Sequence, residues 1–217
     1  MRILVALSTP STKISPLTPA VRELLMANNL PMPSNNLEYE ARFHEVLGRF
    51  TKPAHEMYGH LYPQLERRLK EFSERGHEVH LYYISSRYGL VEASQLVVPH
   101  VPPPGWGRKR TSRQLANKLL VFEELSTLIR KLAPHLVVLV IMPGDLPLLH
   151  DPPQGRDLRR LASLTKIVVV APLSAAKALR KVEGIEVVEA RGSRGRVKGL
   201  LRVLERFSQR TIVEFLR

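Results

Sequence analysis

Hydroxyl, guanidinium and glycine residues follow directly on an apolar run in the stretch HLYYISSRYGLVEASQLVVPH. The five residues are Ser85, Ser86, Arg87, Tyr88 and Gly89. Hydroxyl and guanidinium groups can hydrogen-bond a ligand, and glycine lets a backbone approach it closely. Turn chemistry explains Gly89, because glycine readily adopts a positive φ, but it does not require Ser85, Ser86 and Arg87 in succession at the end of a strand. Two interpretations are therefore open: an ordinary turn, or the lip of a binding site.

A carboxylate follows another apolar run, at Asp145 in PGDLPLLHDP. Open α/β sheets bind ligands beyond the carboxyl ends of their strands, so Asp145 is a candidate acid or hydrogen-bond acceptor. The alternative is an aspartate that merely caps a helix or lies in a loop. With Lys13 and the Tyr58-Gly59 turn, Asp145 and the turn at 85–89 would form one cleft.

The charge of the chain is high and uneven. It has 33 Lys and Arg against 20 Asp and Glu, a net charge of +13, and residues 156–217 alone carry 15 basic and 6 acidic side chains. Such asymmetry indicates a polyanionic partner, nucleic acid before a membrane surface, although an Arg-rich thermophile surface would look similar. The candidate phosphate contacts are Arg108, Lys109, Arg110, Arg113, Arg194, Arg196, Lys198 and Arg202.

The segment ARGSRGRVKG could seat a phosphate. Gly192 and Gly195 allow close backbone approach in the expected loop, and the N-terminus of a helix follows. Its glycine spacing fits neither a Walker A loop nor a dinucleotide-binding fingerprint, and a solvated helix face is the alternative. Trp106, beside the first basic segment, could stack on a base or anchor a proline-rich loop.

Several function classes lack their motifs. The chain has no cysteine, no HExxH and no G-x-S-x-G, so we predict no metal site and no cofactor, and serine hydrolase chemistry is not indicated. No apolar run approaches the roughly 20 residues that span a bilayer, and the N-terminus does not resemble a signal peptide. We expect a cytoplasmic protein without a membrane partner.

Apolar runs alternate with helical patterns along the chain. Expected strands are 2–7, 79–84, 95–99, 136–142, 166–171 and 185–188; expected helices are 18–29, 37–50, one from Pro63, 111–132 and 197–215. The continuous apolar runs at 136–142 and 166–171 are typical of central parallel strands. The pattern predicts a single α/β domain, residues 1–217, whose mainly parallel central sheet has helices on both faces.

Five blocks, in order, resemble the YaaA-type peroxide-stress family. They are MRILVALSTPSTKISPLTP, EARFHEV, KPAHEMYGHLYPQL, YISSRYGLVEASQLVVPHV and SRGRVKGLLRVLERF. The Tyr-Gly-Leu block is the most specific, and related modules resemble the central domain of archaeosine synthases, which act on tRNA. The resemblance implies an α/β fold, a positively charged cleft, DNA-binding capacity and a link to oxidative-stress protection.

Our leading hypothesis is a nucleic-acid-binding protein that contacts backbone phosphates, with DNA preferred over RNA. The alternative is an enzyme that processes a nucleobase or nucleotide in the cleft at the strand ends. A non-catalytic scaffold or membrane-surface binder is a third possibility, which the absence of a basic helix with aromatic anchors disfavours. The sequence gives no oligomeric state.

Overall fold

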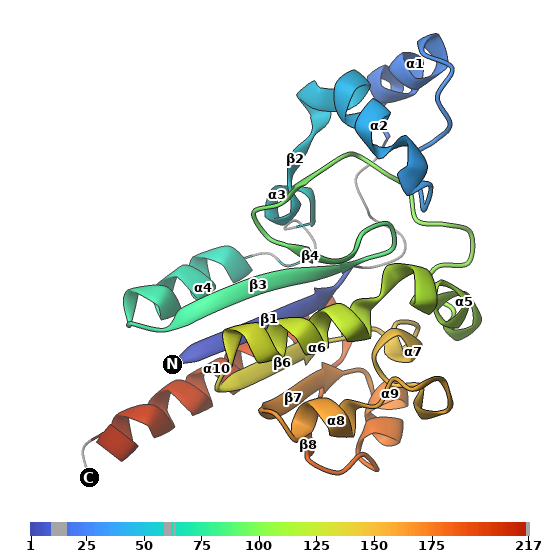
Figure 1. Cartoon of the computed structure of the whole chain (residues 1–217). Helices are drawn as coiled ribbons and strands as arrows, with labels where there is room; N and C mark the ends of the chain where they lie inside the picture. Colours follow the sequence, from blue (N-terminus) through green and yellow to red (C-terminus); the bar gives the residue numbers. More distant parts are fainter. Residues whose placement is uncertain (10–16, 59–61, 63, 216–217) are drawn as a thin grey trace.

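The computed structural model describes residues 1–9, 17–58, 62 and 64–215, with the backbone alone at 193 and 210–215. Its centre is a six-stranded sheet of order β4-β3-β1-β6-β7-β8 (Figure 1). The strands are β1 (Arg2–Ser8), β3 (Glu78–Ser85), β4 (Gly89–Glu92), β6 (Leu136–Val140), β7 (Lys166–Ala171) and β8 (Ile185–Glu189). All pairings are parallel except the β3–β4 hairpin. The predicted α/β class with a mainly parallel sheet is confirmed.

The order of the parallel strands places a switch point between β1 and β6. After β1 the chain crosses to β3 on one side of it, and the later strands β6, β7 and β8 add in turn on the other side. Connections from the two neighbouring strands therefore leave in opposite directions, which opens a crevice beyond their carboxyl ends. In doubly wound sheets this is where ligands bind.

Helices cover both faces of the sheet because the strand side chains alternate between two cores. Ile3, Val5 and Leu7 pack on one face, with α3 (Ala54–Tyr58), α4 (Leu65–Glu74) and α10 (Gly192–Phe215). Leu4 and Ala6 face the other core. The helices on that face are α5 (Lys109–Leu119), α6 (Val121–Leu132), α7 (Leu146–Leu149), α8 (Leu158–Ala162) and α9 (Leu173–Leu179).

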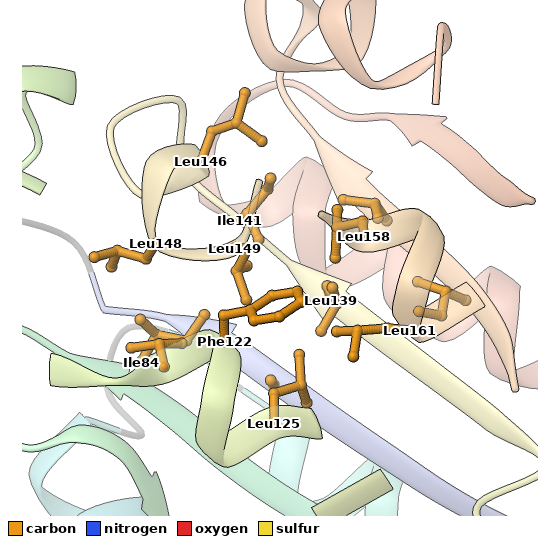
Figure 2. Packing of buried hydrophobic residues seen from close by; sticks show 14 of the residues in the cluster. Ile84, Phe122, Leu125, Leu139, Ile141, Leu146, Leu148, Leu149, Leu158 and Leu161 are labelled. Atoms are coloured by element: carbon orange, nitrogen blue, oxygen red, sulfur yellow. The ribbon is translucent and has the colours of Figure 1, made fainter. Parts of the chain in front are cut away.

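The second core holds the short helix α7 in place. In Figure 2, Phe122 of α6 lies among Leu139 of β6, Leu149 of α7 and Leu161 of α8. The two α7 residues Leu148 and Leu149 are fully buried. Because close-packed side chains resist displacement, the turn that leads from β6 into α7, and with it Asp145, has a fixed position.

A small helical lobe lies beside the sheet, near the β3–β4 hairpin (Figure 1). It consists of α1 (Pro19–Ala27), α2 (Glu40–Leu47) and the 3-10 turns η1 (Leu37–Tyr39) and η2 (Gly48–Phe50). Its own core includes Val21, Leu25 and Phe43, closed by Val98 from the segment after the hairpin. A short pair of strands, β2 (Lys52–Pro53) with β5 (Leu96–Val97), joins the lobe to the rest.

The helix expected over 111–132 is wrong in two respects. It begins at Lys109 rather than at Thr111, and it is divided at Leu120, whose φ is 48°. Leu119 and Val121 are both buried in the same core. On a continuous helix these two side chains would point about 200° apart, so the break lets both reach the core.

The last helix begins earlier than expected, at Gly192 rather than 197, so Arg194 and Arg196 lie on the helix instead of a loop. Of the glycines in this segment, Gly199 serves packing, whereas a Cβ at Gly192 or Gly195 would meet nothing closer than 3.8 Å. A Cβ at Gly199 would lie 2.8 Å from Cγ1 of Val170, so glycine lets the helix rest directly on β7.

Candidate functional site

The carboxyl end of β1 is tied to both neighbouring strands. The Ser8 hydroxyl accepts a hydrogen bond from the Met142 amide at 3.3 Å, just beyond β6. On the other side, the amide and hydroxyl of Thr9 donate to the Ile84 carbonyl at 3.1 and 2.8 Å. The switch point therefore has a fixed geometry, with polar groups at its floor.

Asp145 lies at this switch point and is 1% exposed. It occupies the N-cap position of α7, but its side chain makes no capping bond. Neither carboxyl oxygen has a well-aligned hydrogen-bond partner among the described residues. Burial raises the pKa of Asp145 to about 7, and the nearby Ser8 hydroxyl and Arg196 guanidinium oppose the rise only in part. The carboxyl group can thus gain or lose a proton near neutral pH.

Two further side chains complete the cluster. Arg196, in the second turn of α10, is 6% exposed, and its Nε has no partner within the described part of the chain. The Tyr62 hydroxyl donates to the Ser8 carbonyl. Burial raises the pKa of Tyr62, while the Arg196 charge lowers it. Ser8, Tyr62, Asp145 and Arg196 are called the switch-point cluster below.

A second buried polar chain supports the end of β3. The Tyr58 hydroxyl lies 3.1 Å from Ser85 Oγ and 3.3 Å from His100 Nε2. Burial lowers the pKa of His100 to about 4, so the ring is neutral at pH 7. Its Nδ1–H then donates to the Val98 carbonyl at 2.9 Å, and Nε2 accepts from Tyr58. These bonds join α3, β3 and the segment before the proline-rich loop.

Arg87 is fully buried and bound within the protein. It donates to the Ser34 carbonyl at 2.6 Å and forms an ion pair with Glu40 of α2. Tyr88 also donates to Glu40, at 2.8 Å. The guanidinium lies over the rings of Phe43 and Tyr88, at 5.1 and 5.3 Å from their centroids. Arg87 and Tyr88, both predicted as cleft residues, therefore attach the helical lobe to the hairpin.

The rest of the hairpin turn is also packed tightly. Ser85 Oγ accepts from the Arg87 amide at 3.2 Å. The Ser86 hydroxyl is buried and has no partner among the described residues. Gly89 has a φ of 72°, and a Cβ there would lie 2.2 Å from the Leu119 carbonyl oxygen. The glycine is therefore required both by its backbone conformation and by the close approach of α5.

The first basic segment reaches the switch point from the α5 side. Arg108, Lys109 and Arg110 are exposed. They follow Gly107, whose carbonyl oxygen would lie 2.0 Å from a Cβ at Gly144. The loop that ends at these cations, where α5 begins, therefore touches the turn that carries Asp145. The predicted base-stacking residue of this loop, Trp106, lies in the hydrophobic core and is 6% exposed, which favours the anchoring role.

The remaining candidates fall into three groups. Arg113 is exposed but forms an ion pair with Asp151 at 2.7 Å. Arg194, Lys198 and Arg202 are exposed on α10, whereas Arg196 is turned inward. Lys13 and Gly59 lie outside the described residues. On the β6 side of β1, Arg196 thus lies close enough to Asp145 for its charge to act on the carboxyl group. On the β3 side, Ser85 lies within hydrogen-bond distance of Tyr58.

Ser8 and Tyr62 were missed by sequence reasoning. Tyr62 lies in the block KPAHEMYGHLYPQL and Ser8 in the block MRILVALSTPSTKISPLTP, but nothing in either block indicates that the two residues meet. Tyr62 reaches Ser8 because α4 packs against β1. Ser8 differs from other serines at strand ends only in the residues that lie near it in space, Met142 and Tyr62.

Comparisons with known proteins give no relative for this chain: no family model, no curated protein and no solved structure matches it. Over the described ranges, no helix is long and apolar enough to cross a membrane. The same residues bring no three His, Asp or Glu side chains together where they could share a metal ion.

Proposed function

We propose that this protein binds nucleic acid, DNA in preference to RNA, across the carboxyl edge of its sheet. One observation supports the proposal: two basic segments, distant in sequence, flank the same turn. The loop before Arg108 touches Gly144, and Arg196 of α10 acts on the charge of Asp145, the next residue. Exposed cations from both segments therefore surround one edge.

The cations differ in what they can contribute. Arg108, Lys109, Arg110, Arg194, Lys198 and Arg202 are exposed and can each meet a phosphate. Arg113 is partly neutralised by Asp151, and Arg196 is buried. Contacts of this kind release counterions, so binding weakens steeply as salt rises and depends little on base sequence.

The test is the affinity for a fluorescent single strand and for a duplex at low and at higher salt. The double variant Arg108→Ala/Lys109→Ala is compared with Arg130→Ala/Lys131→Ala. The control removes the same charge from exposed residues at the end of α6, before β6 begins, which is the opposite edge of the sheet. The proposal expects weaker binding in the first variant alone, and equal binding in both would refute it.

The preference for DNA and a link to oxidative-stress protection rest on the resemblance to YaaA-type proteins. Competition between DNA and RNA strands of the same sequence for binding to the protein tests the preference for DNA. Survival of cells lacking the gene after hydrogen peroxide treatment tests the second, and unchanged survival would remove the stress role without affecting nucleic-acid binding.

The switch-point cluster favours a second candidate function, an enzyme that processes a nucleobase or nucleotide. A carboxyl group whose pKa is about 7 can act as a general acid or base at neutral pH. The test is to incubate the protein with DNA, tRNA and nucleotides and to analyse the products by mass spectrometry. A product formed by the wild type and lost in Asp145→Asn supports this function; no product from any of these substrates counts against it.

A further inference from the structure

Asp145 and Arg196 are a buried acceptor and a buried donor that influence one another without pairing. The Arg196 charge lowers the pKa of Asp145, yet neither carboxyl oxygen of Asp145 has a well-aligned hydrogen-bond partner within the described part of the chain. Both carboxyl oxygens and Nε of Arg196 are buried without a well-aligned partner there. Buried groups of this kind normally pair, because each unsatisfied one costs free energy.

The surrounding contacts hold the turn that carries Asp145 in place. Ser8 is tied to Met142 beyond β6, and Tyr62 donates to the Ser8 carbonyl. A Cβ at Gly144 would collide with Gly107, so the turn that carries Asp145 is pressed against the loop that precedes Arg108. The unsatisfied atoms therefore belong to a rigid frame, at the place where doubly wound sheets bind ligands.

The charges restrict what the pair can hold. An amine would be repelled by Arg196, and a phosphate or carboxylate would be repelled by Asp145 whenever its carboxyl group is ionised. A neutral group with an N–H donor beside an acceptor satisfies both. The hydrogen-bonding edge of a nucleobase has this arrangement.

We infer that the switch-point cluster takes up one base of a bound single strand, with its hydrogen-bonding edge between Asp145 and Arg196. This inference rests on the proposed nucleic-acid binding, in which exposed cations hold the phosphates on either side. Because Asp145 and Arg196 are 1% and 6% exposed, uptake of a base requires the groups that cover them to be displaced. The base must also leave its stack, as bases do in other proteins that act on them.

The test compares two probes with equal numbers of phosphates: a short strand of thymidines and the same backbone made of abasic units. Wild-type protein should bind the thymidine strand about tenfold more tightly, the ratio that corresponds to one good base contact. Asp145→Asn, similar in size, should lose this ratio but keep its affinity for the abasic strand. That retained affinity also shows that the variant is folded, and Arg196→Gln provides a second variant with the same expectation.

The outcomes separate the two proposals. If neither strand binds at low salt, nucleic-acid binding itself is wrong. If wild type binds both strands equally, or if Asp145→Asn and Arg196→Gln keep the full preference for thymidines, phosphate binding stands and base uptake is wrong.

Discussion

Arg196 lies close enough to Asp145 to lower the pKa of its carboxyl group, yet burial outweighs this effect and the pKa is about 7. In the unfolded chain an aspartate has a pKa of about 3.9. The folded protein therefore binds a proton at Asp145 more tightly than the unfolded chain does. This relationship gives the fold a pH dependence opposite to that of an ion-paired aspartate.

The free energy of unfolding should carry a component from Asp145 that falls as pH rises. The unfolded state has lost this proton above about pH 4 and the folded state keeps it until about pH 7, so the loss approaches about 1.4 kcal/mol per pH unit between them. Above that range the component is constant. Urea unfolding gives the free energy of unfolding of wild type and of Asp145→Asn at each pH. The difference between the two isolates the Asp145 component, because the contributions of all other groups cancel. If the free energies of unfolding of the two proteins change in parallel with pH, the buried, unpaired state of Asp145 is contradicted.

Gly89→Ala should destabilise the fold more than a glycine substitution elsewhere with the same backbone strain. The new Cβ would lie 2.2 Å from the Leu119 carbonyl oxygen, in addition to the cost of a φ of 72°. Gly76→Ala is the matched control, because its φ is 81° but nothing lies within 4 Å of its Cβ. We expect about 1 kcal/mol for Gly76→Ala and at least about 2 kcal/mol more for Gly89→Ala. Equal losses in urea unfolding would show that α5 does not press on the hairpin.

Breaking the ion pair between Arg87 and Glu40 should loosen the helical lobe. Arg87→Met leaves Glu40 without its partner and should cost about 3 kcal/mol or more, because the guanidinium is fully buried. Arg42→Met removes an exposed pair with Glu45 and should cost less than about 1 kcal/mol. Limited proteolysis should cut first within residues 17–50 in Arg87→Met. The double variant Arg87→Met/Glu40→Gln should recover part of the loss, and no recovery would mean that the pair itself contributes little.

The sheet could be predicted from the sequence, since β6 and β7 are continuous apolar runs and burial on both faces leaves such runs few alternatives. Asp145 could be named as a candidate from its place after an apolar run. The ion pair of Arg87 could not, because Glu40 lies on a helix of another lobe and nothing near Arg87 in sequence indicates it. The break at Leu120 was equally hidden: it depends on the buried faces of α5 and α6 meeting one core, which helical periodicity does not show.

The most direct test of nucleic-acid binding at the carboxyl edge is the salt dependence of affinity for a short single strand. Each phosphate contact contributes about 0.7 to the slope of log K against log salt concentration. Arg108→Ala/Lys109→Ala should therefore lower the magnitude of the slope by about 1.4, two such contacts, while Arg130→Ala/Lys131→Ala leaves it unchanged. A slope that is the same in wild type and both variants, or no binding at low salt, would contradict the account.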